Sequence, residues 1–190
     1  MTLPILRVLQ LLCENHNHDL RNYLRRQPDN IESINLVKEV VVYLEVVYTE
    51  IDKDSIILVT QALDTLNEFS MGNVENQHLL FDSGVLDIVN NIIREPKKSF
   101  FQTTVECSPS QVADLMKKTF TLVKTMLDGN DQQTRKLSIQ VAAILDLEAV
   151  FQTIVSAFFF VCLFLFSKPP SPLPSSALLQ SPYPREAKEE

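Results

Sequence analysis

The sequence predicts an all-α protein, because glycine is scarce and apolar residues recur at helical spacing. Only 3 of the 190 residues are glycine, few for a sheet protein that needs tight hairpin turns. Along most of the chain the apolar residues follow one another in steps of three and four, the period of one helix face. A hydrophobic content of 45% is enough for a core in one ordinary domain, with residues left over.

Eight helices are expected from this spacing and from residues that favour helix ends. The run VVVYLEVVY is rich in β-branched residues, but its apolar period over that length favours a helix. Capping-box spacing occurs from Asp29 to Glu32 and from Ser108 to Gln111, where Pro109 takes the first helical position. The expected helices cover residues 5–14, 18–27, 33–49, 55–71, 74–82, 85–95, 109–128 and 132–150.

The short connections between these helices favour stacked helix pairs over one closed bundle. The segment ENQHLLFDSGVLDIVNNII, residues 75–93, runs from a short helix through a glycine corner into a second helix, and it resembles the centre of an armadillo repeat. The remaining helices show no clean repeat period. We therefore predict an irregular armadillo-like α-solenoid of stacked helix pairs over residues 1–148.

A polar cluster lies between two helical runs in LQLLCENHNHDLRNYLRR, residues 9–26. Asn15 and Asn17 flank a histidine, and asparagine tolerates left-handed backbone and caps helices. A tight turn between two helices is therefore expected. The alternative is a metal site with one open position or a distant fourth ligand, and its candidate ligands are Cys13, His16 and His18 with His78 or Cys107.

The same segment resembles the signature of the inositol trisphosphate receptor and ryanodine receptor family of intracellular calcium-release channels. In the family's homology-associated helical domain, CENHN is followed by Arg, by Asp-Leu and by Gln-Asn-Phe-Leu-Arg. His18, Arg21 and Tyr23 depart from that pattern. Shorter matches are NLV at 35–37, VTQALDTLNEF at 59–69, ENQ at 75–77 and SGVLDIV at 83–89. The signature residues that match are Cys13, Glu14, Asn15, His16, Asn17, Asp19, Leu20, Asn22, Leu24 and Arg25.

This resemblance implies a non-catalytic module of a calcium-release channel without a cofactor. Such a domain belongs to the cytosolic α-solenoid that links ligand sensing to a tetrameric pore in the endoplasmic or sarcoplasmic reticulum membrane. Its implied partners are neighbouring solenoid domains. No ligand or pore residue of the family maps onto this chain, and we expect Arg21, Arg25 and Arg26 on a solvated helix face. Both channel types carry the signature, so the choice between them stays open.

Two features depart from the family pattern. The short segment YTEIDKDS replaces a glycine-rich insert, and the resemblance stops after about residue 147. The acidic residues of YTEIDKDS lack the glycine and the terminal glutamate of a calcium-binding EF-hand loop. We expect a capping turn there.

Other classes of function are disfavoured by composition and by motif. A net charge of -7 removes the attraction to phosphate on which nucleic-acid binding depends. Three widely spaced cysteines indicate a reducing compartment, and the sequence contains no phosphate loop, HExxH or GxSxG motif. The alternative to the channel module is a stand-alone armadillo-like adaptor that grips a peptide through Asn67, Asn90 and Asn91, although such grooves usually add tryptophan, which is absent.

The last part of the chain divides into a hydrophobic segment and a polar tail. Residues 149–167, AVFQTIVSAFFFVCLFLFS, carry no charged side chain, and as a helix they reach nearly ~30 Å, the thickness of a bilayer core. A membrane span and a truncated, spliced or mistaken gene product both account for this segment. Residues 168–190 are rich in Pro and Ser and are expected to be disordered.

Overall fold

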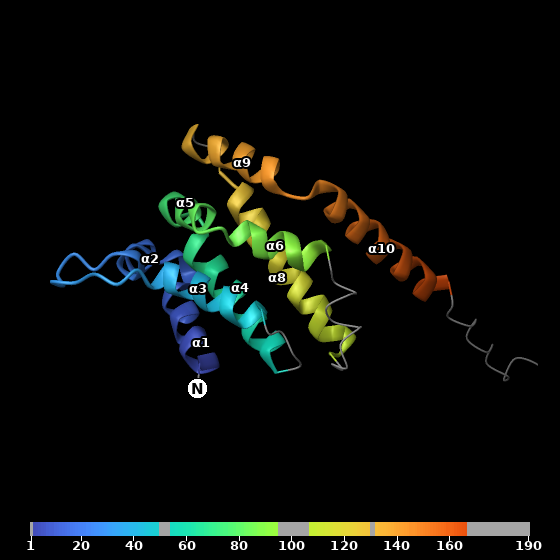
Figure 1. The fold of residues 1–190 in the computed structure, drawn as a ribbon, viewed down its shortest axis with the longest axis horizontal. Helices are drawn as coiled ribbons and strands as arrows, with labels where there is room; N and C mark the ends of the chain where they lie inside the picture. Colours follow the sequence, from blue (N-terminus) through green and yellow to red (C-terminus); the bar gives the residue numbers. More distant parts are fainter. Residues whose placement is uncertain (1, 50–53, 95–106, 130–131, 167–190) are drawn as a thin grey trace, which may run out of the picture. The chain divides into compact units, whose positions relative to one another are not determined.

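The computed structural model describes residues 2–49, 54–94, 107–129 and 132–166, with only the backbone of residues 16 and 157–166. Every regular element within these ranges is helical, which confirms the all-α class. The helices are α1 Thr2–Cys13, α2 His18–Arg25, α3 Leu36–Thr49, α4 Ser55–Ser70, α5 Val74–Asp82, α6 Val85–Arg94, α8 Pro109–Leu127, α9 Gln132–Ile144 and α10 Leu147–Phe166, with a short 3-10 turn, η1, at Glu14–His16 (Figure 1).

The core is built around α4, which packs against α1, α3, α5 and α8. Figure 1 shows α4 running among these helices. Its apolar stripe follows the predicted spacing, and each of its members contributes about 1.5–3 kcal/mol when fully buried. The fully buried members of this stripe are Ile56, Val59, Leu63, Leu66 and Phe69.

The start of α8 matches the predicted capping box. The Gln111 backbone N–H donates to Ser108 Oγ at 3.3 Å, and the Ser108 N–H donates to Gln111 Oε1 at 2.9 Å. Pro109 takes the first helical position, where a missing N–H leaves no bond unmade. These local signals place the beginning of the helix without tertiary help.

The predicted capping box from Asp29 to Glu32 is wrong. Residues 26–35 are not helical and include a turn at residues 28–29, and α3 begins later, with the Lys38 N–H donating to Asn35 Oδ1 at 3.0 Å. Gln27 holds the turns together, because its Oε1 accepts from the Ile34 N–H at 2.8 Å. The hydrogen bonds of the buried Gln27 side chain therefore decide the structure before α3, and the Asp29–Glu32 spacing does not start a helix.

The expected helix over residues 132–150 is two helices, α9 and α10. Asn90 of α6 binds the break, accepting from the Asp146 N–H at 3.0 Å and donating to the Ile144 carbonyl at 3.0 Å. Asp146 then caps α10, because its Oδ1 accepts from the Ala149 N–H at 3.0 Å. Neither glycine nor proline marks this break, so it depends on a contact with a distant part of the chain.

The chain forms two compact units, Met1–Thr153 and Ile154–Glu190. Ala149 and Val150 pack against the core of the first unit, so that core continues past residue 148. Among the residues whose side chains the structure describes, no single helix is long and apolar enough to cross a bilayer. Gln132–Ile144 and Leu147–Ser156 together have the length and composition of a span, but the two helices are bent by 76° at the break between them.

Candidate functional site

The signature segment forms a tight turn between α1 and α2. Asn15 has a left-handed backbone, with φ 59° and ψ 34°. Asn17 caps α2, because its Oδ1 accepts from the Leu20 N–H at 3.1 Å. The two asparagines therefore hold the sharp change of direction, as the sequence led us to expect.

Replacing Asn17 with alanine should lower the free energy of unfolding by about 1 kcal/mol, because only the helix cap is lost. Urea denaturation of the two proteins measures the difference. Elemental analysis of the unmutated protein should find no stoichiometric zinc. Zinc bound in a one-to-one ratio would identify this segment as a metal site instead of a turn.

The cysteine of the signature lies in surroundings that disfavour its charged form. Cys13 is fully buried at the end of α1. Burial raises the pKa of its thiol to about 11, with Arg21 lowering it and Glu68 raising it by smaller amounts. Metal ligation needs the thiolate, which is scarce at neutral pH under these conditions. Among the side chains that the structure describes, no group of three or more His, Cys, Asp or Glu is arranged to hold a metal ion.

Arg21 corrects the expectation of a solvated helix face, because its side chain is fully buried. Its Nη1 donates to the Met71 carbonyl at 2.5 Å, and its Nη2 donates to the Cys13 carbonyl at 3.0 Å. Cys13 ends α1 and Met71 caps the C-terminus of α4, where carbonyls lack helical partners and carry partial negative charge. Glu68 Oε2 lies 3.7 Å from Nη2. One guanidinium therefore joins two helix ends and a carboxylate.

Arg25, one helical turn later, binds the turn between α4 and α5. Its Nη1 donates to Asn76 Oδ1 at 2.6 Å and to Asn73 Oδ1 at 3.3 Å, and its Nη2 pairs with the Glu75 carboxylate. Asn73 in turn donates to Asn22 Oδ1 at 2.8 Å. Asn76 is fully buried. The signature and the ENQ match at residues 75–77, which are far apart in sequence, therefore meet in space.

We name this set of contacts the corner network. It joins α2 to the ends of α1 and α4 and to the start of α5. Its members are Arg21, Asn22 and Arg25 on one side and Cys13, Glu68, Met71, Asn73, Glu75 and Asn76 on the other.

The remaining signature residues surround the network. Leu24 is buried in the core, whereas Leu20 is only half-buried. Asp19 is exposed in the first turn of α2, where a negative charge suits the helix dipole. The Glu14 carboxylate lies 3.8 Å from the Arg7 guanidinium. His16 ends η1, and its side chain lies outside the described part.

Arg21 and Arg25 of α2 and Arg26, which follows the helix, do not form a phosphate site. A shallow hollow of about 480 Å³ lies on α2, and its lining residues are Asp19, Asn22, Tyr23, Arg25, Arg26 and Pro28. Arg21 points instead into the core, and Arg25 is paired with Glu75. The charged groups lining the hollow are therefore Arg25, which is paired with Glu75, Arg26 and the Asp19 carboxylate, and the carboxylate would repel a phosphate.

The asparagines that suggested a peptide-binding groove have internal partners. Asn67 is buried, and its Oδ1 accepts from Thr125 Oγ1 at 2.5 Å. Asn90 is buried at the break between α9 and α10, and its amide binds backbone on both sides of that break. Only Asn91 is exposed. Two of the three side chains therefore bind other parts of the fold. They are not available to bind a peptide, which was the observation that favoured an adaptor.

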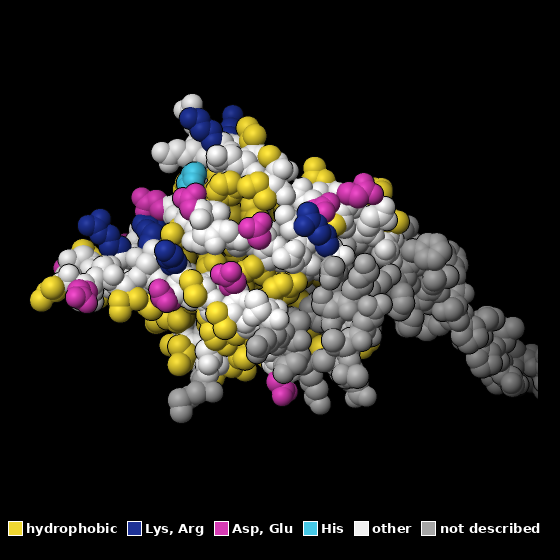
Figure 2. All heavy atoms as spheres, viewed as in Figure 1, with side chains coloured by type: hydrophobic (Ala, Val, Ile, Leu, Met, Phe, Trp, Pro, Cys, Tyr) yellow, Lys and Arg dark blue, Asp and Glu magenta, His cyan; other side chains and the backbone are white. Residues whose placement is uncertain are grey.

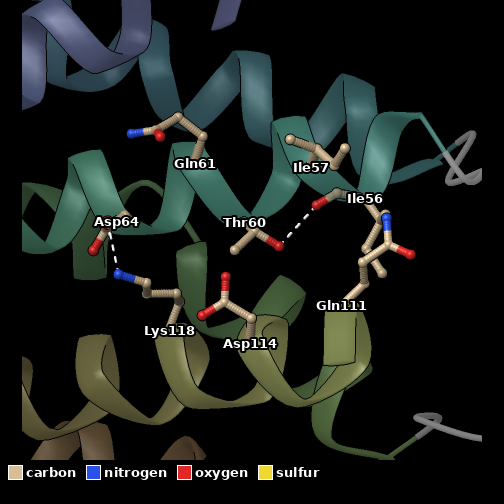
Figure 3. Close-up of a pocket in the computed structure, with 8 residues that line it drawn as sticks. All are labelled: Ile56, Ile57, Thr60, Gln61, Asp64, Gln111, Asp114 and Lys118. Carbon is tan, nitrogen blue, oxygen red and sulfur yellow. Dashed lines mark hydrogen bonds and ion pairs between the residues drawn. The ribbon is translucent and has the colours of Figure 1, made fainter. Parts of the chain in front are cut away.

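A groove of about 250 Å³ lies between α4 and α8 (Figure 3). Lys118 Nζ lies 2.8 Å from Asp64 Oδ2, which also accepts from Gln10 Nε2 at 3.0 Å. In Figure 3, Asp114 points from α8 toward Thr60 of α4. Ligand pockets usually measure about 300–1,000 Å³. We therefore attribute this groove to the packing of two helices whose charged groups are partly paired.

Comparison with known proteins supports the resemblance seen in the signature. Residues 1–93 match the family model described as "RyR and IP3R Homology associated". The inositol 1,4,5-trisphosphate receptor itr-1 of Caenorhabditis elegans is 41% identical over 107 residues, which cover 50% of this chain and 4% of that protein. The inositol 1,4,5-trisphosphate receptor-like protein A of Dictyostelium discoideum is 34% identical over 97 residues, which cover 50% of this chain and 3% of that protein. The chain thus spans a small part of the length of these relatives.

Proposed function

Because this chain belongs, through residues 1–93, to the RyR and IP3R homology associated family, we propose that it acts as a non-catalytic module of an intracellular calcium-release channel. The module transmits conformational change between neighbouring domains of the cytosolic part of the channel. Its place is on the cytosolic side of the endoplasmic or sarcoplasmic reticulum membrane. The corner network is the observation that carries this proposal.

The network suits transmission because it ties several helix ends to one side-chain cluster. Arg21 contacts the ends of α1 and α4, and Arg25 contacts the start of α5. A displacement of α2 therefore pulls on three other helices at once. Buried polar contacts with defined partners have discrete arrangements, and coupling between distant sites needs such elements.

Three polar side chains of the signature have structural partners, which supports a non-catalytic role. Asn17 caps α2, Asn22 accepts from Asn73, and Arg25 binds Asn76 and Glu75. Catalytic groups need a free polar atom beside a substrate-sized cavity. These atoms instead bind helix ends and one another.

An exposed apolar face of α1 supports contact with neighbouring helices. The inner face of α1 packs on α4, with Leu6 buried. Ile5, Val8 and Leu12 lie at helical spacing on the outer face, and they are 55%, 55% and 42% exposed. Figure 2 shows hydrophobic side chains gathered in the region of α1 and α3. A helix with apolar residues on opposite faces needs a partner on each. We propose that adjacent helix pairs of an irregular α-solenoid in a tetrameric channel cover the outer face.

Leu24→Asp in an inositol trisphosphate receptor carrying the equivalent change should weaken calcium release and preserve ligand binding. The substitution places an unpaired carboxylate in the core beside the corner network. Calcium flux from microsomes measures release, and binding of labelled inositol trisphosphate to the same membranes measures the ligand site. We expect release to fall severalfold at equal channel abundance.

Tyr23→Asp is the matched control, because Tyr23 is the preceding residue of α2 and is 43% exposed. It adds the same charge without burying it, so release should remain near that of the unmutated channel. Equal loss of ligand binding in the Leu24→Asp channel would contradict a coupling role. Unchanged release in that channel would do the same.

A further inference from the structure

The first two turns of α10 are held by the first compact unit. The Asp146 carboxylate that caps α10 also accepts from Arg94 Nε at 2.6 Å. Thr153 Oγ1 donates to the Ile93 carbonyl at 3.4 Å, and the unit ends at this threonine. Residues before Ile154 are therefore committed to the packing of this unit.

The remainder of α10, Ile154–Phe166, has a composition that suits lipid better than protein. These 13 residues read IVSAFFFVCLFLF and contain no charged side chain. As a helix, this segment is apolar on nearly all sides. A single partner helix covers only one face of such a helix, whereas the hydrocarbon of a bilayer covers every face.

The length of this remainder distinguishes a membrane anchor from a membrane span. At ~1.5 Å per residue, the segment after Thr153 is about 20 Å long, whereas the hydrocarbon core of a bilayer is about 30 Å thick. The complete helix of 20 residues has the length of a span, but its first two turns contact the core and are not free to enter lipid. The free part is therefore long enough to enter one leaflet and too short to cross the hydrocarbon core.

The beginning of α10 carries an apolar stripe and a polar stripe on different sides of the helix. Leu147, Phe151 and Ile154 follow one another at helical spacing and are 62%, 62% and 57% exposed. Glu148 and Gln152 lie on a different side of the helix, where Gln152 Nε2 donates to Glu148 Oε1 at 3.2 Å. An apolar stripe beside a polar stripe is typical of helices that lie at a membrane interface.

We propose that α10 anchors this chain in one leaflet of a lipid bilayer. Ile154–Phe166 enters the hydrocarbon, Leu147 and Phe151 lie at the interface, and the helix does not cross. The parts of the chain before and after this segment therefore stay on the same face of the membrane. The net charge of -7 means that apolar burial supplies the attraction, so neutral lipid suffices. This proposal does not depend on membership of a channel.

Flotation of the full chain with phosphatidylcholine vesicles tests the anchor. We expect the chain to float with the vesicles, to stay bound in high salt and to gain nothing from added phosphatidylserine. Phe151→Asp combined with Ile154→Asp should reduce the floated fraction about tenfold, because charged groups resist burial in lipid. A wild-type chain that remains below the vesicles overturns the proposal.

Ile139→Asp is the matched control for nonspecific adhesion. Ile139 lies on α9 and is 71% exposed, so it offers as much apolar surface as Phe151 without belonging to the stripe. Its replacement should leave the floated fraction unchanged. A loss equal to that of the α10 variant overturns the assignment of binding to α10.

Protease treatment of sealed microsomes carrying the full chain with a C-terminal epitope tag tests the single-leaflet geometry. We expect protease outside the microsomes to remove the tag and to digest the N-terminal unit as well, because both lie on the same face. A tag that is protected while the N-terminal unit is digested shows a complete span and overturns the proposal.

Discussion

Replacing Arg21 with methionine is expected to lower the free energy of unfolding by about 3–5 kcal/mol. Breaking a buried ion pair by removing one partner has an effect of this size. The guanidinium is fully buried and is hydrogen-bonded to the carbonyls of Cys13 and Met71, so its loss leaves both helix ends without this donor. Glu68 loses its cationic neighbour at the same time. Urea denaturation followed by circular dichroism measures the change.

Two further substitutions separate burial from charge. Arg26→Met removes the same positive charge from an exposed position just after α2, and we expect a change within about 0.5 kcal/mol. Arg21→Gln introduces the residue of the family pattern, which still has an amide donor for one carbonyl. The loss of unfolding free energy in Arg21→Gln should therefore lie between the losses in Arg21→Met and Arg26→Met. Equal stability of the Arg21→Met and Arg26→Met variants would show that the buried contacts contribute nothing.

Asn76→Ala is expected to lower the free energy of unfolding by about 3 kcal/mol. Its amide donates to the Phe69 carbonyl at 2.7 Å and to the Arg21 carbonyl at 3.3 Å, while its Oδ1 accepts from Arg25. Each buried polar group left without a partner costs about 1–3 kcal/mol. The same denaturation measurement applies.

Asn91→Ala is the control for this change, because Asn91 is exposed on α6 and the substitution removes the same amide. We expect little loss of stability. Comparable destabilisation by the two substitutions would mean that the corner network does not explain the importance of Asn76.

Local signals in the sequence account for most of the helices. The stripe of α4, the capping box at Ser108 and the turn at Asn15 and Asn17 depend on neighbouring residues, so spacing and propensity predict them. The starts of α5 and α8 also agree with the expected residues. The stacking of these helices as a continuous solenoid remains a prediction.

The features that sequence reasoning missed depend on residues far apart in the chain. Arg21 reads as a surface residue in an isolated helix, because an arginine is rarely buried without partners. Its partners lie at the ends of two other helices, one of them 50 residues away. The break between α9 and α10 depends in the same way on Asn90. The one feature of the sequence that could have indicated an unusual role for Arg21 is its departure from the glutamine of the family pattern.

The claim that the signature segment functions by docking on the α4–α5 turn is tested most directly by a double-mutant cycle between Arg25 and Asn76. The stability of Arg25→Ala, Asn76→Ala and the double variant is compared with that of the unmutated chain. The 2.6 Å contact between the two side chains predicts a coupling energy of about 1–2 kcal/mol. Additive losses, with a coupling below about 0.3 kcal/mol, would contradict the docking of the signature on this turn.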